Sequence, residues 1–308
     1  MAPTSPDGSS TSRTTPSPSS PPSGSAPSTS GSPGRGLTRR ALIDLARRHG
    51  IRPRKSLGQH FLADPNLARA IAREAGSGPG ERFLEVGAGL GSLTVALAGS
   101  GAEVLALETD RRIAAALEEV VDSLPVRVVV ADATTADWPE MLGDGPWRMA
   151  SNLPYHAAVP IALDLLEQAP AVDPLVVMVQ REVGERLAAG PGEPAFGAVS
   201  LKVAYQADVR VMRRIPPTVF WPEPRVESVL LRLDRQPPPV PGSRERLFEL
   251  IGEGFRERRK TMTTALVRRG LDRDRAREVL ASVGIDPRAR AETLGLEAFA
   301  RLAEAIDG

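Results

Sequence analysis

Short apolar runs alternate with stretches of helical spacing between residues 82 and 188. RFLEV, AEVLALE, WRMASN and DPLVVMVQ are each followed by a segment whose apolar residues recur every three or four positions, and VRVVV lies among them. Strands joined through helices pair in parallel, and apolar runs without alternation are typical of strands buried on both faces. The pattern predicts an α/β fold, in which a mostly parallel, Rossmann-like sheet lies between two layers of helices.

The pattern changes after residue 197. Residues 198–206 have helical spacing, and 207–215 and 227–233 look like strands separated only by a Pro-rich segment. No helix fits between these two strands, so we expect an antiparallel pair at the edge of the sheet. A second Pro-rich break covers 235–243, and the pattern beyond it is helical. We therefore expect a small all-α domain over 243–308, after a main domain over 37–235.

Thirty of the first 36 residues are Ser, Pro, Gly or Thr. Such a segment cannot offset the entropy of ordering, so we expect a disordered tail over 1–36. We find neither the apolar core of a secretory signal nor a run that approaches the roughly 20 apolar residues of a membrane span. The chain has no cysteine and three histidines, which excludes disulfides and thiolate sites and argues against a metal. We expect a cytoplasmic protein.

Basic residues are concentrated in a few segments, although the net charge is only +1. Between residues 35 and 60, eight Arg or Lys residues face a single acidic residue, Asp44, so this segment carries +7 with His neutral. Further clusters lie at 210–214 and 256–260. Basic clusters on a nearly neutral protein indicate a face that binds a polyanion, and solvated helix surfaces are the alternative for any one cluster.

A glycine-rich turn, LEVGAGLGSLT, follows the first strand of the alternation. Its glycines, Gly87, Gly89 and Gly91, have the spacing G-x-G-x-G. The dinucleotide fingerprint G-x-G-x-x-G would need a third glycine at Ser92. Glycine is required in such a turn because the chain bends tightly and a ligand approaches the backbone.

Acidic residues end the first three strands, at Glu85, Glu108 and Asp132. Ligands bind at the carboxyl ends of strands in open α/β sheets, and Glu108 is placed to bind ribose hydroxyls. With the glycine spacing, this set fits a nucleoside cofactor without a pyrophosphate, S-adenosylmethionine. NAD is the second choice, and a tight turn without a ligand is the alternative.

The fourth strand ends in SNLPYH, at residues 151–156. Pro154 stops the strand and holds Leu153 extended, which aims the Leu153 carbonyl outward. That carbonyl and the Asn152 side-chain oxygen can accept the protons of an adenine amine held in line with a methyl sulfonium, and orientation supplies most of the rate. Tyr155 offers a face on which a flipped base can stack. The alternative is an Asn turn followed by a buried Tyr.

Six motifs in order resemble those of one family: KSLGQHFL (55–62), LEVGAGLGSLT (84–94), NLPY (152–155), FWPEPRVESVLLRL (220–233), FRERRKTM (255–262) and GIDPRARAETL (284–294). Together they are similar to the small-subunit ribosomal RNA adenine dimethyltransferases, the KsgA family, from about residue 38 onward. The resemblance implies a class I methyltransferase sheet with a terminal antiparallel pair and a helical C-terminal domain. It also implies transfer of methyl groups from S-adenosylmethionine to N6 of two adjacent adenosines in the 3′-terminal hairpin loop of 16S rRNA.

The resemblance also implies roles for individual residues. Cofactor contacts would be His60, Leu62, Gly87, Gly89, Glu108, Asp132 and Asn152. The target adenine would lie against Asn152, Leu153, Pro154 and Tyr155, with Phe220 as a second stacking face. RNA contacts would be Arg54, Lys55, Arg256, Arg258, Arg259 and Lys260. No metal is implied, and we expect a monomer that acts on 16S rRNA in the small subunit or its precursor.

Three positions depart from the family pattern. Many members have Asn in place of His60, and Trp221 and Glu223 stand where smaller residues or proline are common. One alternative is the related family that dimethylates an adenine of 23S rRNA and confers macrolide resistance, although GQHFL and GIDPRARAETL favour the small-subunit family. The other alternative is a mainly non-enzymatic ribosome-assembly factor, against which the intact cofactor residues argue.

Overall fold

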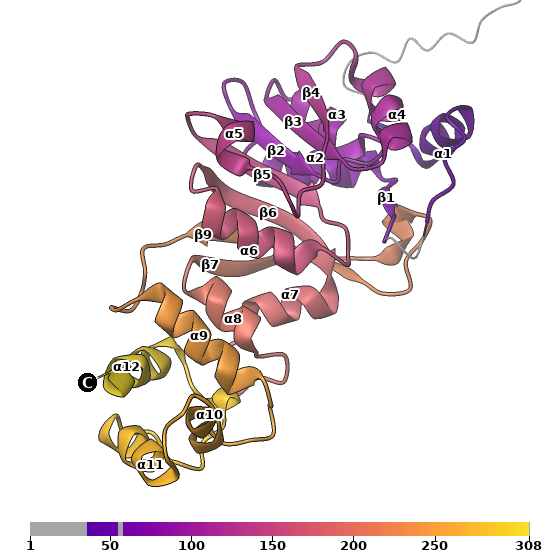
Figure 1. Cartoon of the computed structure of the whole chain (residues 1–308). Coiled ribbons are helices and arrows are strands. Elements are labelled where there is room, and N and C mark those ends of the chain that lie inside the picture. Colours follow the sequence, from indigo (N-terminus) through magenta and orange to yellow (C-terminus); the bar gives the residue numbers. More distant parts are fainter. Residues whose placement is uncertain (1–35, 55–57, 308) are drawn as a thin grey trace, which may run out of the picture. The chain divides into compact units, whose positions relative to one another are not determined.

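A seven-stranded sheet is the centre of this computed structural model, which describes residues 36–54 and 58–307 (Figure 1). The spatial order of the strands is β4-β3-β2-β5-β6-β9-β7. The predicted parallel strands are β2 (Arg82–Val86), β3 (Glu103–Glu108), β4 (Val126–Val130), β5 (Trp147–Asn152) and β6 (Val172–Gln180). The predicted α/β class is confirmed. The predicted tail, apart from Gly36, lies outside the described residues.

The predicted antiparallel pair is also confirmed, as β7 (Ala207–Ile215) and β9 (Ser228–Arg235). The later strand takes the inner place, because β9 lies between β6 and β7 and is antiparallel to both. Its first four residues are buried, whereas β7 carries exposed arginines and an exposed Val211. A strand with charged, exposed side chains suits the sheet edge, and a continuous apolar run suits the interior.

Helices cover both faces of the sheet, as the alternation predicted (Figure 1). Successive side chains of a strand point to opposite faces, so Phe83 packs in one core cluster and Leu84 in the other. The Phe83 side holds α2 (Pro65–Glu74), α3 (Ser92–Ala98) and α4 (Arg111–Val121). The Leu84 side holds α5 (Trp138–Leu142), α6 (Ala158–Gln168), α7 (Arg181–Ala188) and α8 (Ala198–Ala204).

A second, two-stranded sheet joins segments that are distant in the sequence. It pairs β1 (Phe61–Leu62) with β8 (Phe220–Trp221), which follows a 3₁₀ turn at Pro217–Val219. The sequence pattern predicted neither strand, because two residues are too few to show a period. Before β1, α1 (Arg39–Arg48) packs Leu42 and Leu45 into a cluster with Phe61.

The C-terminal residues are helical, as predicted, and include α9 (Arg244–Phe255), α10 (Met262–Arg268), α11 (Arg273–Ser282), a 3₁₀ turn at Ala291–Thr293 and α12 (Leu296–Asp307). Their apolar core also includes Phe196, Leu201 and Tyr205, which lie in and around α8. The division into domains at 37–235 and 243–308 stays a prediction. In the described part of the chain, every helix is too short or too polar to cross a membrane.

Arg235, the last residue of β9, fastens this strand to the end of α6. Its half-buried guanidinium donates four hydrogen bonds of 2.8 Å to the main-chain carbonyls of Leu165, Leu166, Ala169 and Val172. A cation at a helix C-terminus also complements the helix dipole. Arg235 therefore supplies a donor to Leu166 near the end of α6, and a second donor to Leu165 and Ala169, whose carbonyls also accept from the N–H groups of Ala169 and Val172.

Candidate active site

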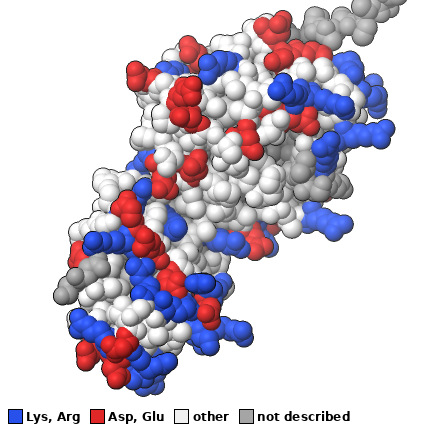
Figure 2. All heavy atoms as spheres, in the orientation of Figure 1, with Lys and Arg blue, Asp and Glu red and all other residues white. Residues whose placement is uncertain are grey.

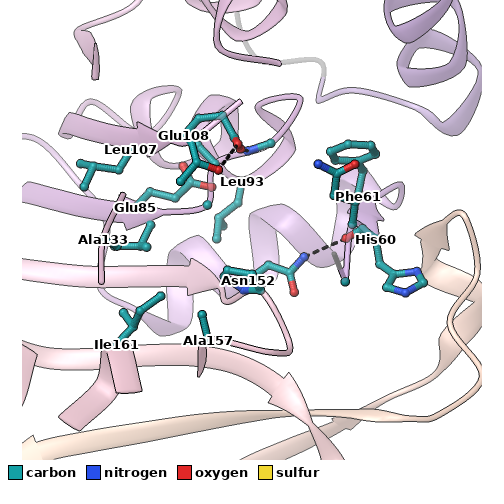
Figure 3. Close-up of a pocket in the computed structure, with 18 of the residues that line it drawn as sticks. His60, Phe61, Glu85, Leu93, Leu107, Glu108, Ala133, Asn152, Ala157 and Ile161 are labelled. Atoms are coloured by element: carbon teal, nitrogen blue, oxygen red, sulfur yellow. Dashed lines mark hydrogen bonds between the residues drawn. The ribbon is translucent and has the colours of Figure 1, made fainter. Parts of the chain in front are cut away.

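A cavity of about 450 Å³ lies at the carboxyl-terminal ends of β2, β3, β4 and β5, within the usual size range of small-molecule sites (Figure 3). The predicted residues that line it are His60, Leu62, Gly87, Gly89, Glu108, Asp132, Asn152 and Pro154. Leu153, Tyr155 and Phe220 do not line it. The fold thus brings together, at one sheet edge, residues that are up to 94 positions apart in the sequence.

The glycine turn shapes the floor of the cavity. Gly87 and Gly89 have φ values of +71° and +57°, which side chains rarely tolerate. A Cβ at Gly89 would stand 2.9 Å from Phe61, and a Cβ at Gly87 would stand 3.2 Å from Pro154. Glycine is therefore required both by the backbone conformation and by the close approach of β1 and the NLPY segment.

Glu108 is tied to this turn. One carboxylate oxygen accepts a hydrogen bond from the Gly89 N–H at 3.0 Å (Figure 3). The other oxygen accepts from the Asp110 N–H at 3.0 Å. Burial raises the pKa of Glu108, and these hydrogen bonds oppose the shift. The second oxygen also lies 3.5 Å from the Thr109 hydroxyl, whereas the oxygen that accepts from Gly89 keeps a further lone pair for a hydroxyl group of a ligand.

Asp132 lies on the exposed rim of the cavity, two residues beyond the end of β4. Its side chain accepts hydrogen bonds from the Thr134 N–H at 2.9 Å and the Thr134 hydroxyl at 2.7 Å, and these bonds lower its pKa. The carboxylate is thus ionised and held in a fixed orientation at the mouth of the cavity.

Glu85 also lines the cavity. The sequence predicted it as an acidic strand end, but it was not among the predicted cofactor contacts. Its side chain is 2% exposed, and one carboxylate oxygen is buried without a hydrogen-bond partner in the described part of the chain. Burial raises its pKa to about 8, and the neighbouring Glu108 adds to the shift. A buried acidic group that is mostly neutral at pH 7 is placed to ionise when a cation enters.

Asn152 ends β5 and is half-buried at the cavity wall. Its amide nitrogen donates to the main-chain carbonyl of His60 at 3.0 Å (Figure 3). This fixes the direction of the amide, and leaves its oxygen buried and without a partner among residues 36–54 and 58–307. Leu153 donates its N–H to Met178 at 3.1 Å, which continues the strand pairing, while its side chain is buried. An unpaired buried acceptor is costly unless a ligand satisfies it.

The two aromatic residues implied as stacking faces are placed differently. Phe220 is fully buried in the core that covers the Phe83 side of the sheet. Tyr155 is half-buried, its hydroxyl lies 3.0 Å from that of Ser228, and its ring stacks on His60. Burial raises the Tyr155 pKa, so the phenol stays neutral. Both stacking roles stay predictions. Ser228 was missed by sequence reasoning.

The family described as ribosomal RNA adenine dimethylase matches residues 50–307. The chain belongs to this family. Ribosomal RNA small subunit methyltransferase A from Thermobifida fusca is 46% identical over 275 residues, which cover 87% of this chain and 95% of that protein. The protein of the same name from Moorella thermoacetica is 41% identical over 276 residues, covering 86% of this chain and 96% of that protein.

Solved structures agree with this assignment. The 23S rRNA methyltransferase ErmE is 26% identical, with a TM-score of 0.62, over 80% of this chain and all of that chain. A dimethyladenosine transferase from Plasmodium falciparum has a TM-score of 0.66 over 79% of this chain and 96% of that chain, and at 20% identity it supports the fold alone. The chain is therefore an S-adenosylmethionine-dependent methyltransferase of the ribosomal RNA adenine dimethylase family.

The cavity fits this cofactor. S-adenosylmethionine carries a sulfonium and an ammonium, and the unpaired buried oxygen of Glu85 offers a negative partner for a cation. Glu108 offers acceptors for ribose hydroxyls. In the described residues no group of His, Cys, Asp and Glu side chains is arranged to hold a metal ion.

The basic residues implied to bind RNA fall into two groups. Arg256 lies 3.7 Å from Glu253, and Arg258 donates to the carbonyls of Pro194 and Phe196. Arg256 and Arg258 are nonetheless exposed, as are Arg54, Arg259 and Lys260 of the second group, and Lys55 lies outside the described residues. Figure 2 shows Lys and Arg gathered over α1, whereas basic and acidic side chains are intermixed over the C-terminal helices.

Proposed function

We propose that this family member transfers methyl groups from S-adenosylmethionine to N6 of two adjacent adenosines in the 3′-terminal hairpin loop of 16S rRNA. The relatives that are 41–46% identical are named small subunit methyltransferases, whereas the 23S enzyme ErmE is 26% identical. The higher identity over nearly the whole described chain supports the small-subunit substrate. The observation that carries the chemistry is the unpaired, buried side-chain oxygen of Asn152 at the cavity wall.

The adenine amine is held by Asn152 and Leu153. The Asn152 oxygen accepts one N6 proton, and the Leu153 carbonyl, aimed outward by Pro154, accepts the other. Two acceptors at fixed positions draw the nitrogen toward tetrahedral geometry and orient its lone pair, so that no titrating base is needed beside it. The His60 carbonyl keeps the Asn152 amide in the required direction, since it accepts only from the NH₂ end.

The cofactor is held by the strand ends on the other side of the cavity. S-adenosylmethionine supplies an electrophilic methyl group on a positively charged sulfur. Glu108 would accept from the ribose hydroxyls, Asp132 would hold the adenine end, and the backbone at Gly87 and Gly89 would let the ligand approach closely. Glu85 would hold the cationic end, where a positive charge favours its ionised form.

RNA approaches over the basic surfaces. Arg54 lies on the segment that leads to His60, and Arg256, Arg258, Arg259 and Lys260 of the C-terminal cluster are all exposed. Each contact with a phosphate releases counterions, so binding weakens with salt. We further propose that the enzyme acts as a monomer in the cytoplasm, on the small subunit or its precursor.

The test compares 16S and 23S rRNA from cells that lack the gene and from complemented cells, by primer extension and nucleoside mass spectrometry. We expect dimethyladenosine to disappear from the 16S 3′ hairpin and to return with the wild type but not with Asn152→Ala. Loss from 23S rRNA instead would favour the substrate of ErmE. Unchanged methylation of both would refute the proposed substrate.

A further inference from the structure

His60 makes three contacts that converge on the residues proposed to hold the target adenine. Its main-chain carbonyl accepts from Asn152 at 3.0 Å. Its ring stacks on Tyr155, with centroids 5.3 Å apart and an interplanar angle of 28°. Its Nδ1 lies 2.7 Å from the carbonyl oxygen of Pro222, and since a carbonyl only accepts, Nδ1 carries the proton.

The His60 ring turns away from the cofactor side of the cavity. Figure 3 shows the imidazole directed away from Glu85 and Glu108, toward the segment that follows β8. Two rings whose centroids lie 5.3 Å apart leave no room for a third ring between them. A base that stacks on this face of Tyr155 must therefore replace the imidazole.

Tyr155 is the fixed member of the pair. Its hydroxyl is hydrogen-bonded to Ser228, the first residue of β9, which lies inside the sheet between β6 and β7. Its backbone N–H packs closely against Gly58, where a Cβ would stand 3.2 Å from the Tyr155 nitrogen. The imidazole, in contrast, is held by one hydrogen bond and one stacking contact. Rotation of the His60 side chain leaves its main-chain carbonyl in place, so the Asn152 amide keeps its direction while the ring moves.

We propose that the His60 side chain gates the base site: it occupies the face of Tyr155 that the target adenine takes, and swings off when the base enters. The inference rests on the proposed function. Displacement breaks the hydrogen bond to Pro222 and one ring contact, so the gate lowers the affinity for any base by roughly tenfold. Adenine recovers this loss by stacking and by its bonds to Asn152, whereas a pyrimidine, which stacks over a smaller area, recovers less.

The kinetic test uses the full-length chain and small subunits from the strain that lacks the gene. His60→Ala removes both contacts of the ring, so we expect kcat/KM for the subunit to rise roughly tenfold, with the KM for S-adenosylmethionine unchanged. His60→Phe keeps a ring on Tyr155 without the bond to Pro222, and we expect a smaller rise. His49→Ala, which removes a histidine bonded to Glu119 at the end of α1, is the matched control and leaves both constants unchanged.

The ring can also be observed directly, because the chain has only three histidines. We expect the His60 ring protons to be shifted upfield in the NMR spectrum by Tyr155, with His49→Ala and His156→Ala variants assigning the other two signals. With S-adenosylhomocysteine filling the cofactor site, adenosine 5′-monophosphate is expected to abolish that shift.

Two results would overturn the gate. A rise in the KM for S-adenosylmethionine in His60→Ala, with kcat/KM for the subunit unchanged or lower, would assign the ring to the cofactor, as the family resemblance implies. A His60 signal that stays shifted while the nucleotide binds would mean that the base uses another face. Either result leaves the proposed function intact if the wild type methylates the subunit, and absence of that methylation would refute the function itself.

Discussion

Cofactor binding is expected to release a proton from Glu85. With a pKa of about 8, this carboxyl group is about 90% protonated at pH 7, because burial penalises the charged form and Glu108 adds to that penalty. A sulfonium or ammonium beside the unpaired oxygen returns the pKa toward the ordinary value of 4.5. Binding at pH 7 should therefore release about 0.9 proton per cofactor molecule.

Isothermal titration calorimetry measures this release. S-adenosylmethionine is titrated into the full-length protein at pH 7 in buffers with different ionisation enthalpies, and the slope of the observed enthalpy gives the number of protons. Glu85→Gln, which is similar in shape and cannot ionise, should abolish the release and weaken binding. Wild-type binding without proton release, or equal release by Glu85→Gln, would refute the reasoning.

The raised pKa of Glu85 also predicts how the stability of the protein changes with pH. The folded-state pKa is raised, so the native state favours the protonated form, and the stability from this group is present in full below about pH 4.5. It is lost as pH rises to about 8, by at most ~1.4 kcal/mol per pH unit. In urea unfolding, the free energy of unfolding of Glu85→Gln relative to the wild type should therefore be higher at pH 8 than at pH 5. If the difference in free energy of unfolding between variant and wild type were the same at both pH values, the raised pKa of Glu85 would be contradicted.

Three further outcomes follow from the structure. Asn152→Ala should lower kcat by roughly 100-fold or more, with RNA affinity unchanged in a filter-binding assay, because it removes an acceptor aimed at the reacting amine; wild-type turnover would refute that role. Arg235→Met should lower the free energy of unfolding by roughly 2 kcal/mol in urea, since four hydrogen bonds from a half-buried cation are lost although Leu165 and Ala169 keep their backbone donors, and a loss below roughly 1 kcal/mol would mean that water replaces the guanidinium. Replacing Arg259 and Lys260 with Gln should flatten the salt dependence of RNA binding by roughly 1.5 in log–log slope, and an unchanged slope would make them solvated residues of the turn between α9 and α10.

Local patterns in the sequence predicted much of the fold. The alternation of apolar runs and helical spacing placed the parallel strands and most of their helices. Asp64 precedes Pro65 at the start of α2, and its carboxylate accepts from the N–H groups of Asn66 and Leu67, a cap that involves neighbouring residues only. The glycine spacing and the acidic strand ends predicted a cavity edge. These signals work because hydrogen-bond periodicity, helix capping and left-handed turns depend on a few neighbouring residues.

Charge counts were less informative about individual residues. The sequence grouped Arg256, Arg258, Arg259 and Lys260 as one basic cluster. In the folded chain Arg258 instead reaches carbonyls more than 60 residues away, and Arg256 pairs with Glu253. All four side chains stay exposed, so the tertiary structure decides which of them have a partner and not which of them reach solvent.

By itself, the sequence determined the fold class and the residue types at the strand ends. Only the tertiary structure decided how those residues are poised: the β1–β8 pairing places His60 against Pro222, 162 positions later, and against Asn152, 92 positions later. It also decided that Glu85 is buried beside Glu108, which raises its pKa. The pKa of Glu85, the direction of the Asn152 amide and the ring contact of His60 all depend on residues that are distant in the sequence and meet only in the folded chain. A periodic pattern of neighbouring residues therefore cannot predict them.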